Sequence, residues 1–295
     1  MTAELTSIPA IRRRRAFNWA RVKRWPIIPL VLLAPVVICG LFGPWIWPHD
    51  PTGIDFAHPL KPPVWMAGGT WTNFLGTDQF GRDLLSRLIE GARITLEIAV
   101  ISSFASAIIG IPAGLISGYY GGKIDNIIMR IVDTELSIPP VLLTILIGGA
   151  LGGGVSTIII SIIFVFWTTY ARVIRSETLV IRQKGFIALA HVADCSGFRI
   201  LFRHIFPNVL PTCVVLFTLQ IGVSVIIEAA ITFIGLGVQP PATAWGLLIS
   251  EGRNYLSTAW WIPTFAGVAI TITVLGANLL GDWLRDALDP KLRQM

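Results

Sequence analysis

The side chains that could do chemistry in this chain are a few acidic groups set inside apolar sequence. Glu228 stands alone in one apolar run, and Asp133 and Glu135 stand together in another. A carboxylate at membrane depth faces a wet cavity or a partner helix more readily than lipid. These three residues are therefore candidates for lining a polar pathway. For Asp133 and Glu135, a structural ion pair of Asp133 with Arg130 and a coupling or gating role both remain open.

A second charged group precedes an apolar run, in the segment LGTDQFGRDLLSRLIEGAR at positions 75–93. Thr77 or Asp78 could cap a helix there, and leucines at helical spacing give it an apolar stripe. The expected wetter side holds Arg82, Asp83, Arg87 and Glu90. One interpretation is an interfacial helix with a solvated charged face. The other is a contact surface for an extracytoplasmic partner, made by Asp78, Arg82, Asp83 and Arg87.

Known patterns of catalytic and metal sites are absent from the sequence. There is no phosphate-binding glycine loop, no HExxH, no GxSxG and no catalytic-triad pattern. Cys39, Cys195 and Cys213 match no CxxC spacing, and we interpret them as packing residues. The sequence predicts a protein that is not an enzyme and that holds no metal or cofactor of its own.

The composition is that of a membrane protein. Apolar residues make up 54% of the 295 positions and charged residues 14%, and several apolar runs reach the ~20 residues needed to cross a bilayer as a helix. Backbone groups in lipid must bond within their own segment, so the predicted fold class is all-α. The net charge of +6 is explained by cationic loops that set orientation, and we expect contact with membrane lipid but not with nucleic acid.

Six transmembrane helices are expected, with both termini in the cytoplasm. The basic N-terminus resembles a signal peptide, but the apolar run after it is too long and no A-x-A cleavage site follows. Pro139 and Pro140 must break the third span, as a hinge or as a kink. The expected spans are 26–47, 95–119, 127–151, 155–173, 209–235 and 258–280. The expected parts are a tail (1–24), a first span (25–47), an extracytoplasmic segment (48–93), a transmembrane core (94–285) with a loop at 174–207, and a tail (286–295).

The basic stretch from 172 to 208 is the most informative loop. Its excess of arginine and lysine places it on the cytoplasmic side. Its apolar residues follow a helical period, with one expected face made of Phe186, Leu189, Ala190 and Ala193. A break at Gly197 precedes a second amphipathic run, 198–206. Two short helices with a turn between them are therefore predicted, and we interpret them as a socket for a cytoplasmic motor.

The same stretch carries a family resemblance. GFIALAHVADCSGFRILFRHIFPN (185–208) resembles the EAA loop of permeases of ATP-binding-cassette importers. LGTDQFGRDLLSRLIEGARITL is similar to the signature of C-type permease subunits of the dipeptide/oligopeptide/nickel family. Further matching segments are GYYGGKIDNIIMRIVD, FIGLGVQPP, AWG, EGRNY and LGDWLRDALDP. Together they cover most of the chain from 75 to 290.

The resemblance implies a type I (MetI-like) importer permease in the bacterial cytoplasmic membrane. The implied partners are a B-type permease, two ATP-binding subunits that hold ATP and magnesium, and an extracytoplasmic solute-binding lipoprotein or periplasmic protein. The implied cargo is di- or oligopeptide. Nickel chelates, glutathione or oligosaccharide are alternatives for the same machine, and a stand-alone channel or secondary carrier is the alternative from another class.

The resemblance also assigns residues to the contact with the ATP-binding subunits. These are Phe186, Ile187, Ala188, Ala190, Asp194, Gly197 and Arg203. Phe186 and Ile187 would give apolar contact, and Arg203 would reach acidic groups of the partner. The family usually has Glu-Ala-Ala where this chain has Ala188-Leu189-Ala190, and glycine where it has Asp194. Gly197 is the candidate to take over the turn.

Overall fold

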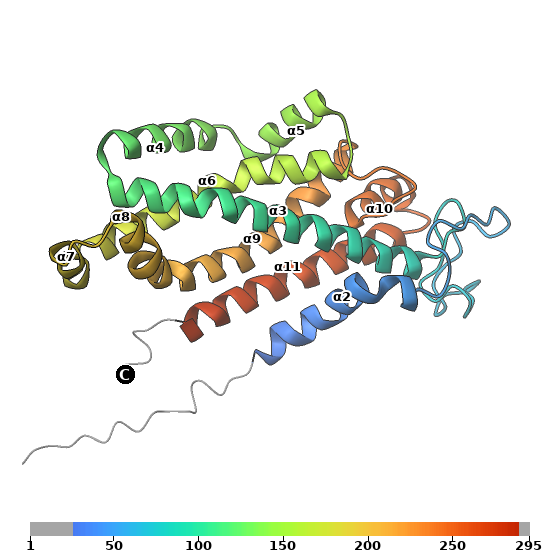
Figure 1. Ribbon diagram of the computed structural model, residues 1–295. Helices are drawn as coiled ribbons and strands as arrows, with labels where there is room; N and C mark the ends of the chain where they lie inside the picture. Colours follow the sequence, from blue (N-terminus) through green and yellow to red (C-terminus); the bar gives the residue numbers. More distant parts are fainter. Residues whose placement is uncertain (1–25, 289–295) are drawn as a thin grey trace, which may run out of the picture.

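The computed structural model describes residues 26–288, and within them the regular structure is helical, with no strand. Long helices lie side by side in an elongated bundle (Figure 1). In the described part of the chain, five helices are long and apolar enough to cross a membrane, or up to six if one bent pair counts as a single span. The long helices are α2 (Ile27–Ile46), α3 (Leu84–Tyr120), α6 (Val155–Arg182), α9 (Phe206–Ile234) and α11 (Trp261–Leu288).

Helices α3 and α6 pack at backbone distance. A Cβ added to Gly110 would lie 2.3 Å from the carbonyl oxygen of Trp167, and one added to Gly114 would lie 2.5 Å from that of Ala171. Gly118 continues this stripe one turn later. Small residues four apart let helix backbones approach in lipid, where burial of apolar surface no longer drives association.

The third predicted span is not one helix. It consists of α4 (Gly122–Leu136) and α5 (Pro140–Leu151), whose axes are bent by 88°. Pro140 takes the first position of α5, where its missing N–H costs nothing. Pro139 is extended, since a residue before proline avoids the helical region. The break expected at the prolines is therefore present, as a sharp corner between two helices.

Residues 84–93 of the charged outer segment and the second predicted span form one helix, α3. Its 37 residues extend ~55 Å, longer than a bilayer including its headgroup regions is thick. Its cap is Asp83, whose side chain accepts a hydrogen bond from the backbone N–H of Ser86 at 2.9 Å. The expectation of a separate interfacial helix capped by Thr77 or Asp78 is wrong, because no breaker separates residues 84 and 95.

The two ends of the bundle differ. One end carries the non-helical segment 47–83 and a short buried helix, α10 (Trp245–Gly252). The other end carries α7 (Gly185–Val192) and α8 (Gly197–Arg199) (Figure 1). The first turn of α2 and the last turn of α11 lie toward the α7 end (Figure 1). Helix α11 continues to Leu288, beyond its predicted end, and the predicted tail 1–24 lies outside the described residues.

Candidate functional site

Helix α7 has a buried side and an exposed side. Ile187 is 1% exposed and packs with Ala190 into a cluster that includes Tyr119 of α3 and Ile181 of α6. On the opposite side of α7, large apolar side chains are exposed, because nothing in the described structure covers them. These exposed residues are Phe186, Leu189 and Val192. Their spacing of three places them on one side of the helix.

This division corrects the predicted face of the loop. Ala190 was grouped with Phe186, Leu189 and Ala193, but Ala190 is buried while the other three are exposed. Ile187, expected to contact a partner, is enclosed within its own chain. The periodicity showed that an apolar stripe exists, but α7 is apolar on two sides, so the sequence did not indicate which side faces the spans.

The turn after α7 is made by Asp194. Its φ of +55° is the left-handed conformation that favours glycine and that aspartate tolerates. The backbone N–H of Cys195 then donates to the carbonyl of Ala190 at 3.0 Å, which satisfies one of the last carbonyls of the helix. Asp194 therefore occupies the family's glycine position and makes the turn itself.

Gly197 was expected to take over the turn, but it does not. Its φ is not positive, and it begins α8, which Ser196 caps. A Cβ on Gly197 would lie 3.2 Å from the Tyr119 ring, so a larger residue here would require that ring to shift. Phe198 and Phe202 follow, with ring centroids 4.4 Å apart, and both are exposed. Ala188 and Arg203 are also exposed.

The predicted pair of Arg130 with Asp133 does not form. Asp133 instead accepts a 2.5 Å hydrogen bond from Arg172 of α6, and Glu135 accepts one from Nε1 of Trp167 at 2.8 Å. Both partners come from α6, which lies beside α4. Residue spacing within α4 alone could not reveal them.

A stronger link between α4 and α6 was not predicted. Arg175 donates to both carboxylate oxygens of Asp125 at 2.6 Å each, and Ser117 of α3 also donates to Asp125. Arg175 belongs to the basic run and Asp125 to the GYYGGKIDN segment, so both were visible in the sequence. Their pairing depends on the turn between α3 and α4.

Glu228 is enclosed between α3 and α9. It is fully buried and accepts hydrogen bonds from Thr232 at 2.8 Å and from Thr95 at 3.2 Å. Glu228 was expected to face a wet cavity or a partner helix, and it faces a neighbouring helix, α3. No contact joins it to Asp133 or Glu135 among the described residues. A pathway-lining role for the three acidic residues stays a prediction.

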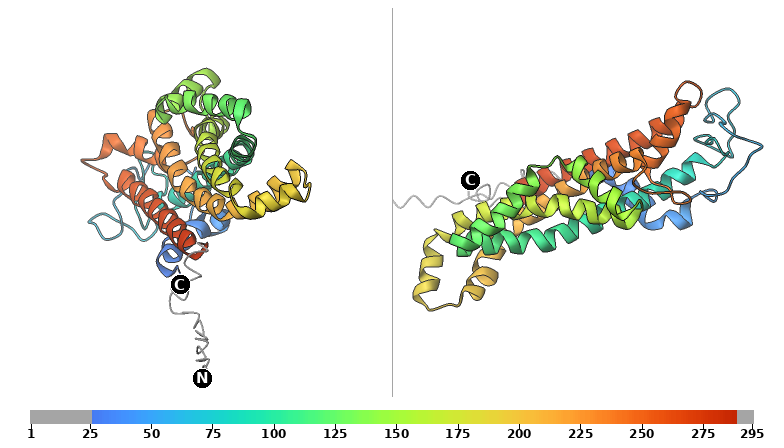
Figure 2. Two further views of the ribbon diagram at one scale, coloured as in Figure 1. Left: turned by 90° about the vertical axis from the view of Figure 1, so that its left-hand side faces the viewer. Right: turned by 90° about the horizontal axis from the view of Figure 1, so that it is seen from above.

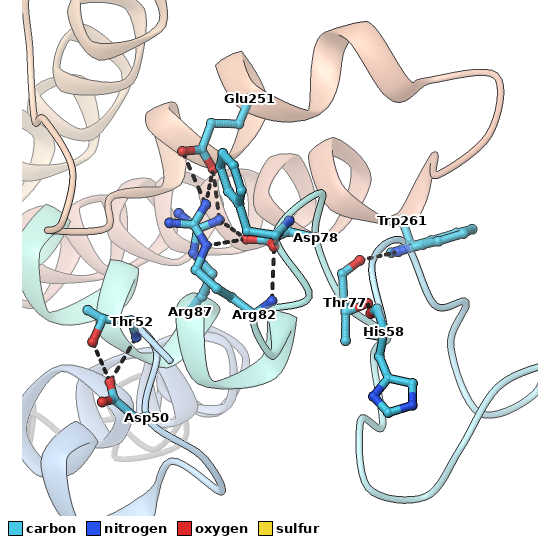
Figure 3. A network of polar contacts seen from close by, with 10 residues as sticks. Asp50, Thr52, His58, Thr77, Asp78, Arg82, Arg87, Glu251 and Trp261 are labelled. Atoms are coloured by element: carbon cyan, nitrogen blue, oxygen red, sulfur yellow. Dashed lines mark hydrogen bonds and ion pairs between the residues drawn. The ribbon is translucent and has the colours of Figure 1, made fainter. Parts of the chain in front are cut away.

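The charged residues before α3 are buried, so the expected solvated face is wrong. Asp78 and Arg87 have no exposed area, and Arg82 and Asp83 have less than a tenth. Asp78 and both arginines meet Glu251 of α10 in one cluster (Figure 3). The compensating carboxylate is 164 positions from Arg87, beyond the reach of any periodicity argument. Contact of these residues with an extracytoplasmic partner stays a prediction.

Asp55, an exposed carboxylate of the segment 47–83, has a lowered pKa. The ring of His58 and the backbone N–H of Ala57 both bond the carboxylate of Asp55, and they lower the pKa of its carboxyl group. Asp55 is thus a charged group, and it lies outside the cluster that Asp78, Arg82, Arg87 and Glu251 form.

Comparison with known proteins decides the family. Residues 110–294 match the family described as "Binding-protein-dependent transport system inner membrane component". The chain belongs to this family. It is a multi-pass permease component of the bacterial inner membrane, and the resemblance to permeases of ATP-binding-cassette importers is confirmed. A stand-alone channel or carrier is thereby set aside.

Several relatives cover most of this permease. It is 39% identical to the di/tripeptide transport system permease protein DppC of Pseudomonas aeruginosa, over 90% of this chain and 87% of the relative. It is 36% identical to the probable D,D-dipeptide transport system permease protein DdpC of Escherichia coli, over 99% and 98%. It is 40% identical to the glutathione transport system permease protein GsiD of Pectobacterium atrosepticum, over 77% and 75%.

A solved structure confirms the predicted fold. A chain of the MetNI methionine ABC transporter, described as inward facing, aligns with a TM-score of 0.58 and 22% identity. The alignment covers 68% of this permease and 96% of that chain. The MetI-like helical core is therefore shared.

Proposed function

We propose that this permease is the C-type subunit of an ATP-driven importer of di- and oligopeptides. It would pair with a B-type permease, two ATP-binding subunits and an extracytoplasmic solute-binding protein. The observation that carries the proposal is the two-sided α7: one side packs into the spans, and the other leaves Phe186, Leu189 and Val192 uncovered at one end of the bundle. A helix built in this way can pass movement from a bound partner to the spans.

The cargo assignment rests on the names of relatives. Those of Pseudomonas and Escherichia are named for di/tripeptides and D,D-dipeptides. The Pectobacterium relative is named for glutathione, which is itself a tripeptide derivative, so glutathione is the second candidate. Short peptides are the class that these names share.

The mechanism follows from the absence of a phosphate-binding loop in the sequence. ATP and magnesium would be held by the partner subunits, and closure of that pair would pull α7. Ile187 and Ala190 would transmit the pull because they pack against Ile181 and Tyr119 on α6 and α3. The spans would then rock between inward-facing and outward-facing states, and the solute-binding protein would release peptide into the open cavity.

In the proposed orientation, α7 lies in the cytoplasm. Basic residues dominate the stretch 172–208, as expected for a cytoplasmic loop. The start of α2 and the end of α11 lie toward the same end, so both termini would be cytoplasmic (Figure 1). The segment 47–83 and α10 would then face the binding protein.

The proposal predicts that a charge on the exposed side of α7 uncouples the transporter. Leu189→Asp places an unpaired carboxylate in an apolar contact, which costs on the order of 1–3 kcal/mol. We expect peptide uptake to fall at least tenfold and the ATP-binding subunits to be lost during purification. Binding-protein-dependent uptake in proteoliposomes and subunit stoichiometry after purification measure the two effects.

Val180→Asp is the matched control. Val180 is also exposed and apolar, and it lies on α6, outside α7. Near-normal uptake by Leu189→Asp, or an equal defect in both variants, would contradict the docking assignment. Identification of the ligand that co-purifies with the binding protein tests the cargo separately.

A further inference from the structure

Four charged side chains close a ring at the outer end of the bundle (Figure 3). Oδ2 of Asp78 accepts from Nε of Arg82 at 2.6 Å and from Nη1 of Arg87 at 2.5 Å. Oε2 of Glu251 accepts from the same Arg87 atom at 2.8 Å and from Nη2 of Arg82 at 3.1 Å. We call these four residues the outer ion cluster. Its formal charge is zero.

The outer ion cluster joins two different parts of the chain. Three members lie within ten positions, on the turn before α3 and on its first helical turn. Asp78 is fixed within that turn because Oδ1 also accepts the backbone N–H groups of Phe80 and Arg82. Glu251 alone comes from α10. The ring is therefore complete only while α10 lies against the start of α3.

Helix α10 is tied to the outer ends of two spans. A Cβ on Gly246 would meet the backbone of Ala229 in α9 at 2.6 Å, and one on Gly252 would meet Pro263 of α11 at 2.6 Å. Contacts this close leave no room for α10 to move by itself. Movement of the outer ends of α9 and α11 away from α3 would carry Glu251 with them.

The arginines depend on Glu251 for charge balance. Arg87 is fully buried, and its Nε and Nη2 atoms have no hydrogen-bond partner among the described residues. Without Glu251, two guanidinium groups would share one carboxylate. A buried charge that loses its partner is strongly destabilising, so the ring favours two states, closed or fully separated and hydrated.

We propose that Glu251 is a positioning residue that latches α10 to the start of α3 and holds the outer end of the permease closed, and that this latch opens during each transport cycle. The proposal rests on the proposed transport function, because a cycle is needed to open it. Neutral links support the closed state: Nε1 of Trp261 donates to the carbonyl of Thr77 at 3.2 Å, and Nε1 of Trp245 to that of Leu88 at 3.0 Å. Only the outer ion cluster favours two states, one with all of its charges paired and one with its members fully separated and hydrated.

The test uses the complete transporter in lipid, with Cys39, Cys195 and Cys213 replaced by alanine. Ala244→Cys is the reporter, since Ala244 is fully buried and immediately precedes α10. A membrane-impermeant maleimide added from the outside measures how often this end opens without ATP. We expect Glu251→Gln to raise the labelling rate roughly tenfold, a mid-range coupling effect. Glu251→Asp should keep the slow rate of the parent.

Two further variants separate a latch from a purely structural contact. Arg82→Gln/Glu251→Gln removes one charge of each sign, so Asp78 stays paired with Arg87 but no ion pair joins α10 to α3. A latch predicts that this variant also labels faster than the parent, whereas a contact that only balances charge predicts labelling within about twofold of the parent. Asp55→Asn, the same chemical change at the exposed carboxylate, should leave the rate unchanged. If Glu251→Gln assembles poorly, the double variant still decides the question.

Three results would overturn the latch. They are unchanged labelling in Glu251→Gln, labelling of the double variant at the rate of the parent, and an equal rise in labelling in Asp55→Asn. Each would leave the proposed function intact, provided that the parent imports peptide. Failure of the parent to import peptide or to retain ATP-binding subunits would instead contradict the proposed function, whatever the labelling shows.

Discussion

Asp194 shows how a residue type can depart from its family while the backbone keeps its shape. A positive φ is needed to turn the chain between α7 and α8, and aspartate is among the few side chains other than glycine that adopt it readily. The charge of Asp194 is therefore incidental to the turn. Gly197, by contrast, has no positive φ and packs closely against the Tyr119 ring.

Substitutions at Asp194 should follow backbone strain. Asp194→Gly should keep uptake near normal. Asp194→Val should lose it, because a β-branched residue in the left-handed region costs about 1–2 kcal/mol or more. Uptake in proteoliposomes and the thermal stability of the purified complex measure both effects. Equal behaviour of the two variants would show that the carboxylate, and not φ, matters at this position.

At the scale of elements, two ion pairs fasten α4 to α6, and they differ in environment. The side chains of Asp125 and Arg175 are 14% and 30% exposed, whereas those of Asp133 and Arg172 are 63% and 54% exposed. The first pair is bidentate and gains a further donor from Ser117. Because α4 turns by 88° into α5, these pairs hold the corner of the broken span in place.

The two pairs should contribute unequally to stability. Asp125→Asn removes a charged, double hydrogen bond and should lower the stability of the complex by ~1.5–3 kcal/mol. Asp133→Asn removes an exposed pair and should change it by less than ~1 kcal/mol. Denaturation of both variants in the same lipid compares them. A larger loss for Asp133→Asn would mean that α4 is held mainly by its exposed face.

At the scale of the molecule, apolar residues remain exposed along the long helices and at both ends. Lipid and the expected second permease would cover the exposed sides of the helices. The remaining surfaces for water-soluble partners are then α7 and the outer segment 47–83. In the proposed orientation, α7 is cytoplasmic and segment 47–83 is extracytoplasmic, and the two lie at opposite ends of the bundle (Figure 2).

The orientation gives a direct prediction. In a cysteine-free background, Trp71→Cys should react with an impermeant maleimide in intact cells, because Trp71 is 82% exposed in the outer segment. Leu189→Cys should react only after the membrane is opened, since its loop is basic and therefore cytoplasmic. Labelling of Leu189→Cys in intact cells would invert the topology and remove the basis for docking to ATP-binding subunits.

The sequence by itself determined what depends on local order. Apolar runs of membrane length, the prolines at 139 and 140, and the first short helix of the basic loop all follow from neighbouring residues. The second predicted short helix is instead the start of one continuous helix, Gly197–Ile234. The local features specify helices and a break, because backbone bonding in lipid and proline geometry act over a few residues.

Tertiary structure decided which charges are paired and which sides are covered. Glu251 neutralises Arg87, Arg175 holds Asp125, and α7 buries Ile187 while exposing Leu189. Each outcome depends on residues distant in the chain meeting in space. The energy of a buried charge or an apolar side chain is set by that encounter, and residue type and spacing alone do not contain it.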